Sequence, residues 1–294
     1  MPLSSLVKLF GLAAIWGGSF LFMRIAAPVL GPVLLIQIRV ALAAVFLLVV
    51  ALIQVRRLPV KAHWRHFLIL GVFNTAFPFL LFAWAAETLP ASLMSVLNAT
   101  SPIWGAVLGA VWTRTPLSMK TIAGLGLGVA GVAILVGFDA GHLTPKALLS
   151  VAAGLIAACS YAVAALYSRH AKSVDAFSNA HGSMWAATLV LVPATPFFPA
   201  VAMPNLWVML CVGLLGVVCS GIAYILYFKL VDEIGAAQAL TVTFLVPIFG
   251  VLWGSLILHE HVGPLSLVGA AFIITGTALI TGFSPKVLLQ RATA

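Results

Sequence analysis

Charged side chains are scarce in this sequence of 294 residues, of which only 7% are charged and six are acidic. Soluble domains contain about 25% charged and about 45–50% apolar residues, whereas this chain is 63% hydrophobic. A soluble protein of this composition could not cover its surface with polar groups. The composition excludes the soluble classes and predicts a protein that is surrounded by lipid.

Cysteine and clustered charge are also lacking. The three cysteines, Cys159, Cys211 and Cys219, lie in apolar stretches without metal-like spacing, which argues against a disulfide framework and a zinc site. The net charge is +9, but the basic residues are scattered over short connections, which argues against a nucleic-acid partner. We expect membrane lipid and a small molecule as partners and no metal or cofactor, and the oligomeric state stays open.

Long apolar runs, in contrast, are abundant. A helix needs about 20 apolar residues to cross a bilayer. Runs of this kind occur at 5–26, 33–54, 66–86, 91–113, 119–138, 147–168, 179–199, 206–229, 236–258 and 264–283. They are apolar throughout rather than alternating, so transmembrane strands are not expected. The sequence predicts an all-α integral membrane protein with ten transmembrane helices.

The distribution of Lys and Arg predicts the orientation of these helices. With a cytoplasmic N-terminus, twelve basic residues fall on the cytoplasmic side, while only Arg24 and Lys146 fall on the other side. Cytoplasmic connections are enriched in Lys and Arg. Both termini, including a tail at 284–294, are therefore predicted to be cytoplasmic.

The two halves of the chain resemble each other at an offset of 145 residues. Between 91–138 and 236–283, ten of 48 positions are identical, including Pro102 with Pro247 and Gly124 with Gly269. Each half, 1–140 and 146–283, contains five predicted helices, so the second half would enter the membrane upside down. Inverted repeats are a common basis of alternating access, with the substrate near the midplane between them.

Several motifs resemble the EamA family of the drug/metabolite transporter superfamily, over nearly the whole chain. They are Trp16-Gly17-Gly18-Ser19-Phe20, the stretch from Arg39 to Ala44, the midhelix prolines Pro102 and Pro247, and Glu260 followed by Gly269 and Gly276. Thr115 stands where the first repeat of the family usually has glutamate. The resemblance implies a ten-helix exporter of metabolites in a bacterial inner membrane, with aromatic and other neutral amino acids as the favoured substrates.

Other functions stay open at this point. Related branches of the superfamily carry drugs, organic cations or nucleotide-type metabolites. A channel would need a ring of charges or carbonyls around a pore. An enzyme is not expected, because the His259-Glu260-His261 triplet lacks the spacing of a zinc-binding helix.

Polar and aromatic residues within the apolar runs are candidates for a substrate cavity, because polar groups at membrane depth tend to face the bundle interior. Asn74, Phe77, Pro78 and Leu81 share one helical face, and Ser220, Tyr224 and Tyr227 do so in the eighth run. Trp16 and Tyr161 are equivalent under the offset. The predicted cavity residues are Trp16, Ser19, Asn74, Phe77, Ser95, Asn98, Tyr161, Tyr224, Thr241 and Thr243.

Arg39 is the one cation that the sequence places clearly within a predicted helix. It lies about 9 Å below the external end at ~1.5 Å per residue, so it could either extend to the surface or act as a gate or as the partner of a substrate carboxylate. Pro102 and Pro247 are expected to kink their helices and to serve as hinges.

Acidic residues are absent from the middle of the predicted helices, since all six lie at or near helix ends. All seven histidines are likewise in predicted loops or at helix ends. Proton-driven carriers often use an intramembrane acid or histidine. We therefore expect facilitated exchange without carboxylate-based proton coupling.

Overall fold

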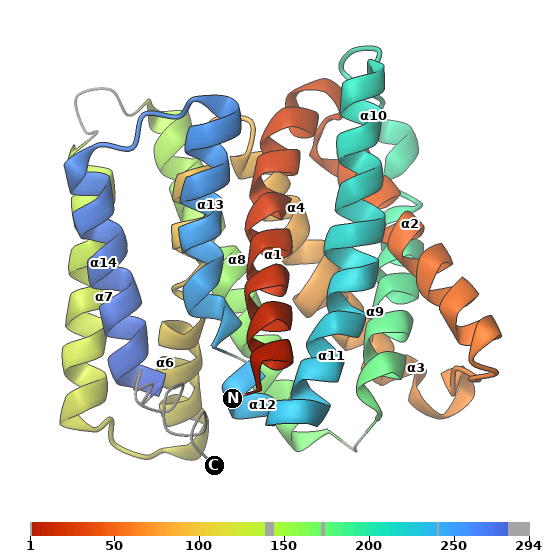
Figure 1. The fold of residues 1–294 in the computed structure, drawn as a ribbon, viewed down its shortest axis with the longest axis horizontal. Coiled ribbons are helices and arrows are strands. Elements are labelled where there is room, and N and C mark those ends of the chain that lie inside the picture. The colour runs from red at the N-terminus through yellow and green to blue at the C-terminus, as the bar shows by residue number, and fades with distance from the viewer. Residues whose placement is uncertain (1, 139–143, 172–173, 240, 282–294) are drawn as a thin grey trace.

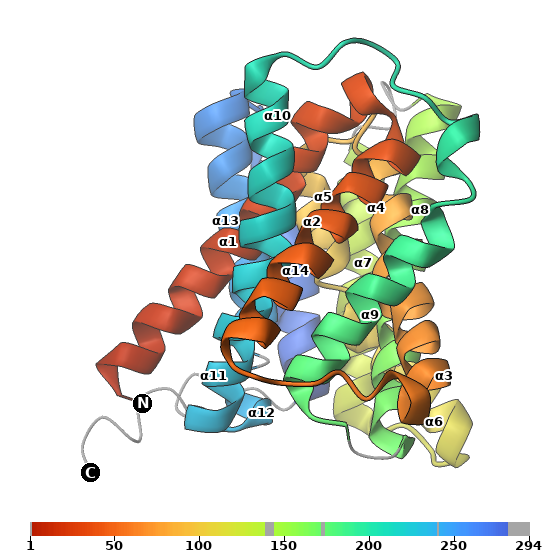
Figure 2. The ribbon, with the colours of Figure 1, turned by 90° about the vertical axis from the view of Figure 1, so that its right-hand side faces the viewer.

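The computed structural model describes residues 2–138, 144–171, 174–239 and 241–281, and over these ranges the chain is helical without any strand. The helices lie side by side and run between two faces of the molecule (Figure 1). We call them the lower face, where the first helix begins, and the upper face, where it ends. Figure 2 shows the bundle from its side.

The first half begins with two long helices joined by a tight turn. Gly31 makes this turn with a φ of +73°, a conformation that glycine adopts without steric cost, and Pro32 starts the next helix, where a missing N–H costs nothing. The elements are α1 (Leu3–Leu30), α2 (Pro32–Ile53), α3 (Val60–Leu70), the π-helix η1 (Gly71–Ala76), α4 (Phe77–Ala85), α5 (Ala91–Asn98), α6 (Ser101–Thr113) and α7 (Met119–Phe138).

The second half has a similar series of elements. They are α8 (Pro145–His170), α9 (Ala176–Leu191), the short 3-10 helix η2 (Thr195–Phe197), α10 (Leu206–Gly213), the π-helix η3 (Leu214–Ile222), α11 (Ala223–Ile234), α12 (Ala236–Ala239), α13 (Val242–Leu258) and α14 (Pro264–Thr281). The chain connection from 139 to 143 and the tail from 282 lie outside the described residues.

Five of the predicted runs differ from the observed helices, and two of them, 91–113 and 236–258, are each divided into two helices. The run 179–199 ends early, at Leu191, because Pro193, Pro196 and Pro199 follow and proline cannot continue a helix. The runs 66–86 and 206–229 each contain a π-helical segment that the hydrophobic pattern did not indicate. Insertions of this kind are rare and frequently lie at functional sites.

Many landmarks of the two halves correspond at the offset of 145 residues. The equivalent of η1, 216–221, lies within η3, and α6 and α13 end at the equivalent residues Thr113 and Leu258. The residues that follow, Arg114 and His259, both adopt a left-handed conformation, with φ of 53° and 52°. The repeat therefore extends from sequence to backbone conformation.

Small residues bring α7 and α14 into close contact. A Cβ atom placed on Gly124 would lie 2.6 Å from the carbonyl oxygen of Gly276, and one on Gly131 would lie 2.7 Å from that of Gly269. Gly124 and Gly269 are equivalent, as are Gly131 and Gly276, so the contact obeys the repeat. Small residues at such interfaces allow close approach of helix backbones within membranes.

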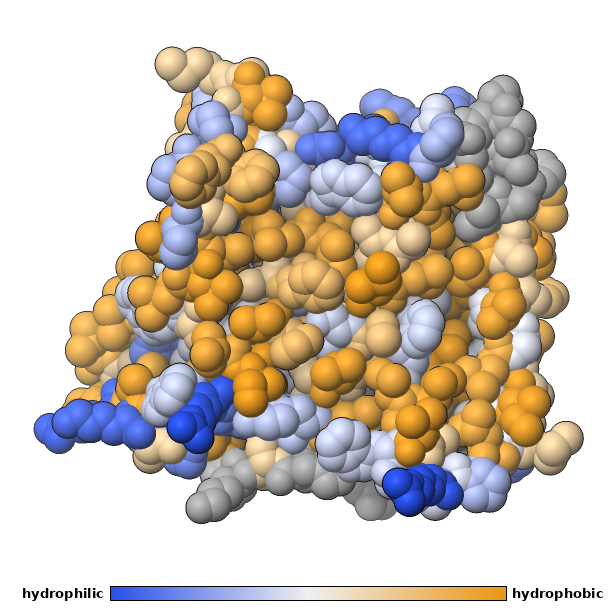
Figure 3. All heavy atoms as spheres, turned by 180° about the vertical axis from the view of Figure 1, so that it is seen from behind, coloured by the Kyte–Doolittle hydropathy of each residue, from blue (hydrophilic) through white to orange (hydrophobic). Residues whose placement is uncertain are grey.

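The outer surface has the polarity that a membrane protein requires. In the view of Figure 3, hydrophobic side chains form a broad band across the middle, and the strongly hydrophilic ones lie toward the upper and lower faces. Among the described residues, seven helices are long and apolar enough to span a bilayer, and Met119–Leu135 and Val242–Leu258 are shorter apolar helices.

Ionic contacts hold elements together at both faces. At the lower face, Lys8 and Ser5 of α1 hydrogen-bond to Glu233 at the end of α11 and thereby lower the pKa of its carboxyl group. At the upper face, Lys146 Nζ lies 3.3 Å from a carboxylate oxygen of Glu87. These contacts hold α1 to α11 at the lower face and α8 to the end of α4 at the upper face, outside the apolar band.

Candidate functional site

Arg39 lies in the interior of the bundle, on α2, with only 4% of its surface exposed. Its Nε atom donates a hydrogen bond of 2.9 Å to Ser220 Oγ, and Nη1 lies 3.5 Å from the sulfur of Met23. The guanidinium carbon lies 3.6 Å from the centre of the Phe79 ring. The side chain does not extend to the surface, which leaves the gate or carboxylate interpretation.

No described carboxylate pairs with this cation. The ion pairs found among the described residues involve Lys8, Arg56 and Lys146, and none includes Arg39. The titratable side chains near its guanidinium group are Tyr161, Cys219 and Tyr224, and none of them carries a negative charge in its ordinary state. A buried cation without an anion is costly in a low-dielectric interior.

The two π-helical segments position the polar partners of this site. In η3, Ser220 Oγ accepts from Arg39 and donates to the carbonyl oxygen of Leu215 at 3.0 Å. In η1, Asn74 lies close enough to Tyr224, which follows η3, for the two side chains to interact. The helix irregularities therefore serve to direct polar groups toward the interior.

Aromatic rings pack around the polar groups. The Trp16 ring lies 6.2 Å from that of Tyr224 and 5.6 Å from that of Tyr227, and Phe82 stacks on Tyr161 at 6.5 Å between ring centres. Three of the four tyrosines of the chain are thus here. We call this set the Arg39 cluster; its members are Trp16, Met23, Arg39, Asn74, Phe79, Phe82, Tyr161, Ser220, Tyr224 and Tyr227.

The Arg39 cluster is built from equivalent positions of the two halves. At the offset of 145 residues, Trp16 corresponds to Tyr161, Phe79 to Tyr224, and Phe82 to Tyr227. Ser220 corresponds to Thr75, whose buried Oγ1 has no hydrogen-bond partner among the described residues. Arg39 corresponds to Met184, which is fully buried. The cluster is symmetric in its rings and asymmetric in its charge.

Five of the predicted site residues meet in this cluster, namely Trp16, Arg39, Asn74, Tyr161 and Tyr224. Ser19 is buried on α1. Phe77 does not join them, because 41% of its side chain is exposed. The prediction assumed α-helical spacing from Asn74, and the wider turn of η1 moves Phe77 off that face.

Ser95 belongs to a second contact, between α5 and α13. Its side chain lies directly against Gly250, and its hydroxyl donates to the carbonyl oxygen of Ser92 at 2.7 Å. The Glu260 carboxylate accepts hydrogen bonds from the backbone N–H groups of Ala91 at 2.6 Å and Ser92 at 3.0 Å. Glu260 thereby caps α5 and fastens it to the end of α13 at the upper face.

The equivalent contact at the lower face is missing from the described residues. At the offset of 145 residues, α6 is the equivalent of α13, and the start of α13 belongs to the equivalent of α5. Among the described residues, α6 and the start of α13 do not pack together as α5 and α13 do. No described residue lies within 4 Å of a Cβ atom placed on Gly105, the equivalent of Gly250. The side-chain hydroxyl of Thr115, the equivalent of Glu260, is hydrogen-bonded to the exposed hydroxyl of Thr113, at 2.7 Å.

The remaining predicted residues lie at the breaks of the proline-containing helices. Asn98 ends α5, and its carbonyl oxygen accepts from the Ser101 hydroxyl at 2.7 Å. Pro102 is in the first turn of α6, so the helix is interrupted before it rather than kinked at it.

The second proline lies differently. Pro247 is inside α13, which begins at Val242. The hydroxyl of the preceding residue, Thr241, donates a hydrogen bond of 2.7 Å to the carbonyl oxygen of Gln238. Thr243 is half-buried in the first turn of α13. These residues are placed near the helix breaks.

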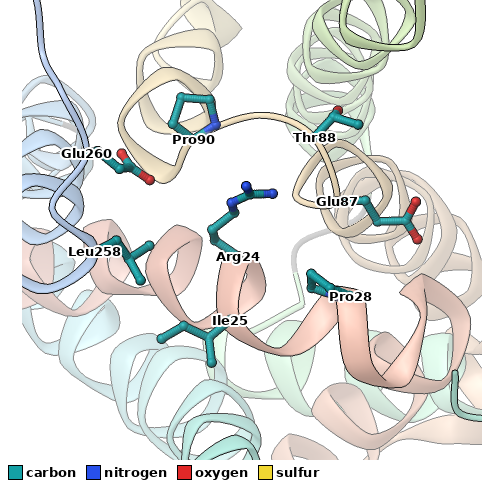
Figure 4. A pocket seen from close by; sticks show the side chains of 8 residues that line it. All are labelled: Arg24, Ile25, Pro28, Glu87, Thr88, Pro90, Leu258 and Glu260. Carbon is teal, nitrogen blue, oxygen red and sulfur yellow. The ribbon is translucent and has the colours of Figure 1, made fainter. Parts of the chain in front are cut away.

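A cavity of about 440 Å³ opens at the upper face (Figure 4). It lies between the end of α1, the turn from α4 to α5 and the end of α13. Arg24 extends across it toward that turn and donates a hydrogen bond of 2.7 Å to the carbonyl oxygen of Ala86, while Glu87 points away. The lining residues are Arg24, Ile25, Pro28, Glu87, Thr88, Pro90, Leu258 and Glu260.

A family model described as the EamA-like transporter family matches this chain twice, at residues 3–137 and at residues 148–282. The chain belongs to the EamA-like transporter family. The two matched segments cover the two halves that the offset had separated, and membership in the EamA-like family confirms the resemblance seen in the sequence motifs.

Known relatives agree with this family. The chain is 26% identical to the uncharacterized transporter YvbV of Bacillus subtilis, over 96% of this chain and 92% of that protein. It is 27% identical to a probable terminal-alkyne amino-acid exporter of Streptantibioticus cattleyicolor, over 68% and 67% of the two chains. A solved structure titled "Crystal structure of protein" has a similar fold, with a TM-score of 0.65, 19% identity and 99% of each chain covered.

The EamA-like membership makes the chain a multi-pass membrane transporter of a small molecule rather than an enzyme. The apolar helices and the hydrophobic band agree with this class. The residues of the cluster that are not among the predicted site residues are Met23, Phe79, Phe82, Ser220 and Tyr227, and of these the sequence analysis noted only Ser220 and Tyr227, on one helical face. The offset of 145 residues pairs Phe79 with Tyr224 and Phe82 with Tyr227, so the repeat itself was the signal that would have found the two rings.

Proposed function

We propose that this chain exports small metabolites across a bacterial inner membrane, with aromatic and other neutral amino acids as the leading substrates. The observation that carries the proposal is the buried Arg39, which has no described counter-ion and lies among aromatic rings from both halves. A substrate carboxylate would supply the missing anion, and the rings would hold an apolar or aromatic body.

The transport unit consists of ten transmembrane helices in two inverted repeats, 1–140 and 146–283, with both termini cytoplasmic. In support, α1 begins at the lower face and its equivalent α8 begins at the upper face (Figure 1). Ser5 of α1 hydrogen-bonds to Glu233 at the lower face, at 2.9 Å, and the equivalent Ser150 and Thr88 hydrogen-bond near the upper face, at 2.6 Å. Equivalent contacts thus occur at opposite faces, as an inverted repeat requires.

Transport proceeds by alternating access to the Arg39 cluster. The contact between α5 and α13, fastened by Glu260, closes the path to the upper face. The lower face lacks the equivalent contact among the described residues. Opening of the contact at the upper face, together with formation of its equivalent at the lower face, would expose the cluster to the upper face. Pro102 and Pro247, near the helix breaks, would serve as hinges.

Arg39 also separates this proposal from the alternatives. A buried arginine repels an organic cation, which disfavours a carrier of cationic drugs. Nucleotide-type metabolites bring several negative charges, whereas the cluster holds one positive charge. A channel would let solute pass without saturation, whereas a carrier saturates.

Counterflow in proteoliposomes tests the proposal directly. Vesicles loaded with unlabelled tryptophan should transiently accumulate labelled tryptophan from outside, with saturable initial rates. Phenylalanine, a nucleoside and an organic cation serve as alternative solutes on the same vesicles. Counterflow of the cation alone, or flux without saturation, would refute the amino-acid carrier.

Energy coupling has its own test. The acids among the described residues, Glu87, Asp175, Asp232, Glu233 and Glu260, lie at or beyond helix ends, and Asp139 lies outside the described residues. We expect exchange down the solute gradient. Uphill uptake that is driven by a pH gradient alone would contradict facilitated exchange.

A further inference from the structure

The charge of the Arg39 cluster sets a requirement on the ligand. The cluster holds one buried cation, and its other polar groups are neutral hydroxyl and amide groups, with Ser220 and Met23 as the closest partners of the guanidinium. The phenol of Tyr224 and the amide of Asn74 lie close to each other within it. No described carboxylate is available there to neutralise a second positive charge.

The repeat supports a site with a single charge, because it shows which residue occupies the position equivalent to Arg39. A zwitterion has two poles, and a two-fold site could hold them at its two equivalent positions. Arg39 occupies one of these positions, but the other holds Met184, and Ser220 is matched by Thr75. Met184 and Thr75 are both fully buried. The site is therefore built for one ionic group rather than for two.

We propose that the Arg39 cluster prefers organic monocarboxylates with an apolar or aromatic body over the amino acids that share the same skeleton. A monocarboxylate brings the net charge of the occupied site to zero, whereas a zwitterion leaves it at one positive charge and an amine raises it to two. Uncompensated charge is costly in a medium of low dielectric constant. The aromatic rings that surround Arg39 supply the apolar contact for the body of the ligand.

This inference rests on the proposed function, because it assumes that the cluster is the substrate site of a carrier. It changes the expected order of substrates within the carboxylate class. Amino acids remain substrates, with their ammonium group accommodated by aromatic faces and hydroxyl groups rather than by an anion.

Three compounds with the same indole ring and side-chain length test the preference. Indole-3-propionate has the carboxylate alone, tryptophan has both groups, and tryptamine has the amine alone. Because lipophilic acids leak through bilayers, equilibrium binding to the purified protein is measured by displacement of radiolabelled indole-3-propionate. We expect indole-3-propionate to bind about tenfold more tightly than tryptophan, which corresponds to about 1.4 kcal/mol, and tryptamine not to displace it.

Variants of Arg39 assign the preference to this side chain. Arg39→Met copies the residue of the equivalent position, Met184, and should weaken binding of indole-3-propionate at least tenfold. Arg39→Lys retains the charge and should retain the order of the three compounds. Arg57→Met removes an exposed arginine outside the cluster and is the matched control, in which the order should not change. Gel filtration and thermal unfolding verify that each variant is folded.

The outcomes distinguish the two proposals. Tighter binding of tryptophan than of indole-3-propionate, with tryptophan counterflow intact, would overturn the monocarboxylate preference alone. The same preference in Arg39→Met as in the wild type would also overturn it. Absence of counterflow for every solute tested would instead refute the carrier function.

Discussion

Arg39 and its neighbours show how single residues define this site. The sequence predicted an intramembrane cation, but surface exposure and a role in binding were equally compatible with its position in the chain. The structure places it against Ser220 and the ring of Phe79. The partners come from α2, α4 and η3, and no pattern within one helix could have brought them together.

Asn74 and Tyr224 lie close together and come from the two halves of the chain. We expect Asn74→Ala and Tyr224→Phe each to weaken ligand binding, because each removes a polar group of the cluster that is able to form a hydrogen bond worth about 0.5–1.5 kcal/mol. The double variant should lose less than the sum of the two single losses. Isothermal titration of the four proteins measures this coupling.

Additive losses would show that the two side chains do not act together. Tyr167→Phe is the matched control, because this tyrosine lies outside the cluster and its hydroxyl pairs with His66 at 3.2 Å. Binding in this variant should equal that of the wild type. His66 and His181 are buried, which the sequence did not indicate because both lie close to helix ends.

Helices were the level that the sequence predicted best. Apolar runs gave the type and approximate position of most elements, because a helix that crosses lipid must satisfy its own backbone hydrogen bonds. The two π-helices were missed, since the wider turns of a π-helix do not change how hydrophobic the apolar run is. This miss displaced Phe77 from the predicted face, whereas Asn74 and Tyr224 are half-buried members of the Arg39 cluster.

The close contact of α7 with α14 gives a prediction about stability. Gly124→Ala should destabilise the protein by about 1–3 kcal/mol, because the added methyl group would overlap the backbone of α14. Gly126→Ala, on the same helix, is the control, since nothing lies within 4 Å of its Cβ position. It should be neutral or stabilising by up to ~1 kcal/mol, as alanine is the better helix former.

Thermal unfolding of both variants in the same detergent checks this expectation. Equal stability of Gly124→Ala and the wild type would show that α7 and α14 do not approach as closely as described. A loss of stability in Gly126→Ala would show that helix α7 does not tolerate any side chain along this surface.

Glu260 gives a prediction about the contact between α5 and α13. Glu260→Ala removes two hydrogen bonds from a carboxylate, each worth about 1.5–3 kcal/mol when a charged group takes part, and should favour opening of the upper face. In a background with the three cysteines replaced, Ser19→Cys reports access to the interior. Its reaction with an impermeant thiol reagent from the upper side should become at least several-fold faster.

Thr115→Ala is the matched control, because Thr115 is the equivalent of Glu260 and caps no helix among the described residues. The rate of Ser19→Cys modification should not change in this variant. An unchanged rate in Glu260→Ala would show that Glu260 stabilises α5 without contributing to closure of the upper face.

At the scale of the whole molecule, the internal repeat was the most informative feature of the sequence. Ten identities in 48 positions predicted a duplicated architecture, and the paired rings and equivalent left-handed caps extend it into three dimensions. The asymmetry could not be predicted in this way. It arises from single replacements, Met184 for Arg39 and Thr115 for Glu260, whose meaning depends on contacts between helices distant in sequence.

The arrangement of the faces predicts the sidedness of labelling in cells. Lys61 is in the first turn of α3 and Lys146 is in the first turn of α8. Helix α3 begins toward the lower face and α8 begins at the upper face (Figure 1). Because the positive charges concentrate at the lower face, we expect Lys61→Cys to be labelled from the cytoplasm only and Lys146→Cys from the outside only. Labelling of both from the same side would contradict the proposed topology.

Alternating access is tested most directly by two distances related by the repeat. Spin labels at Glu87 and Ile257 report on the upper face, and labels at the equivalent positions Asp232 and Trp112 report on the lower face. In proteoliposomes with and without substrate, we expect pulsed electron spin resonance to show one distance distribution shortening as the other lengthens. Two distributions that stay fixed, or that change in the same direction, would contradict a carrier with two inverted halves around the Arg39 cluster.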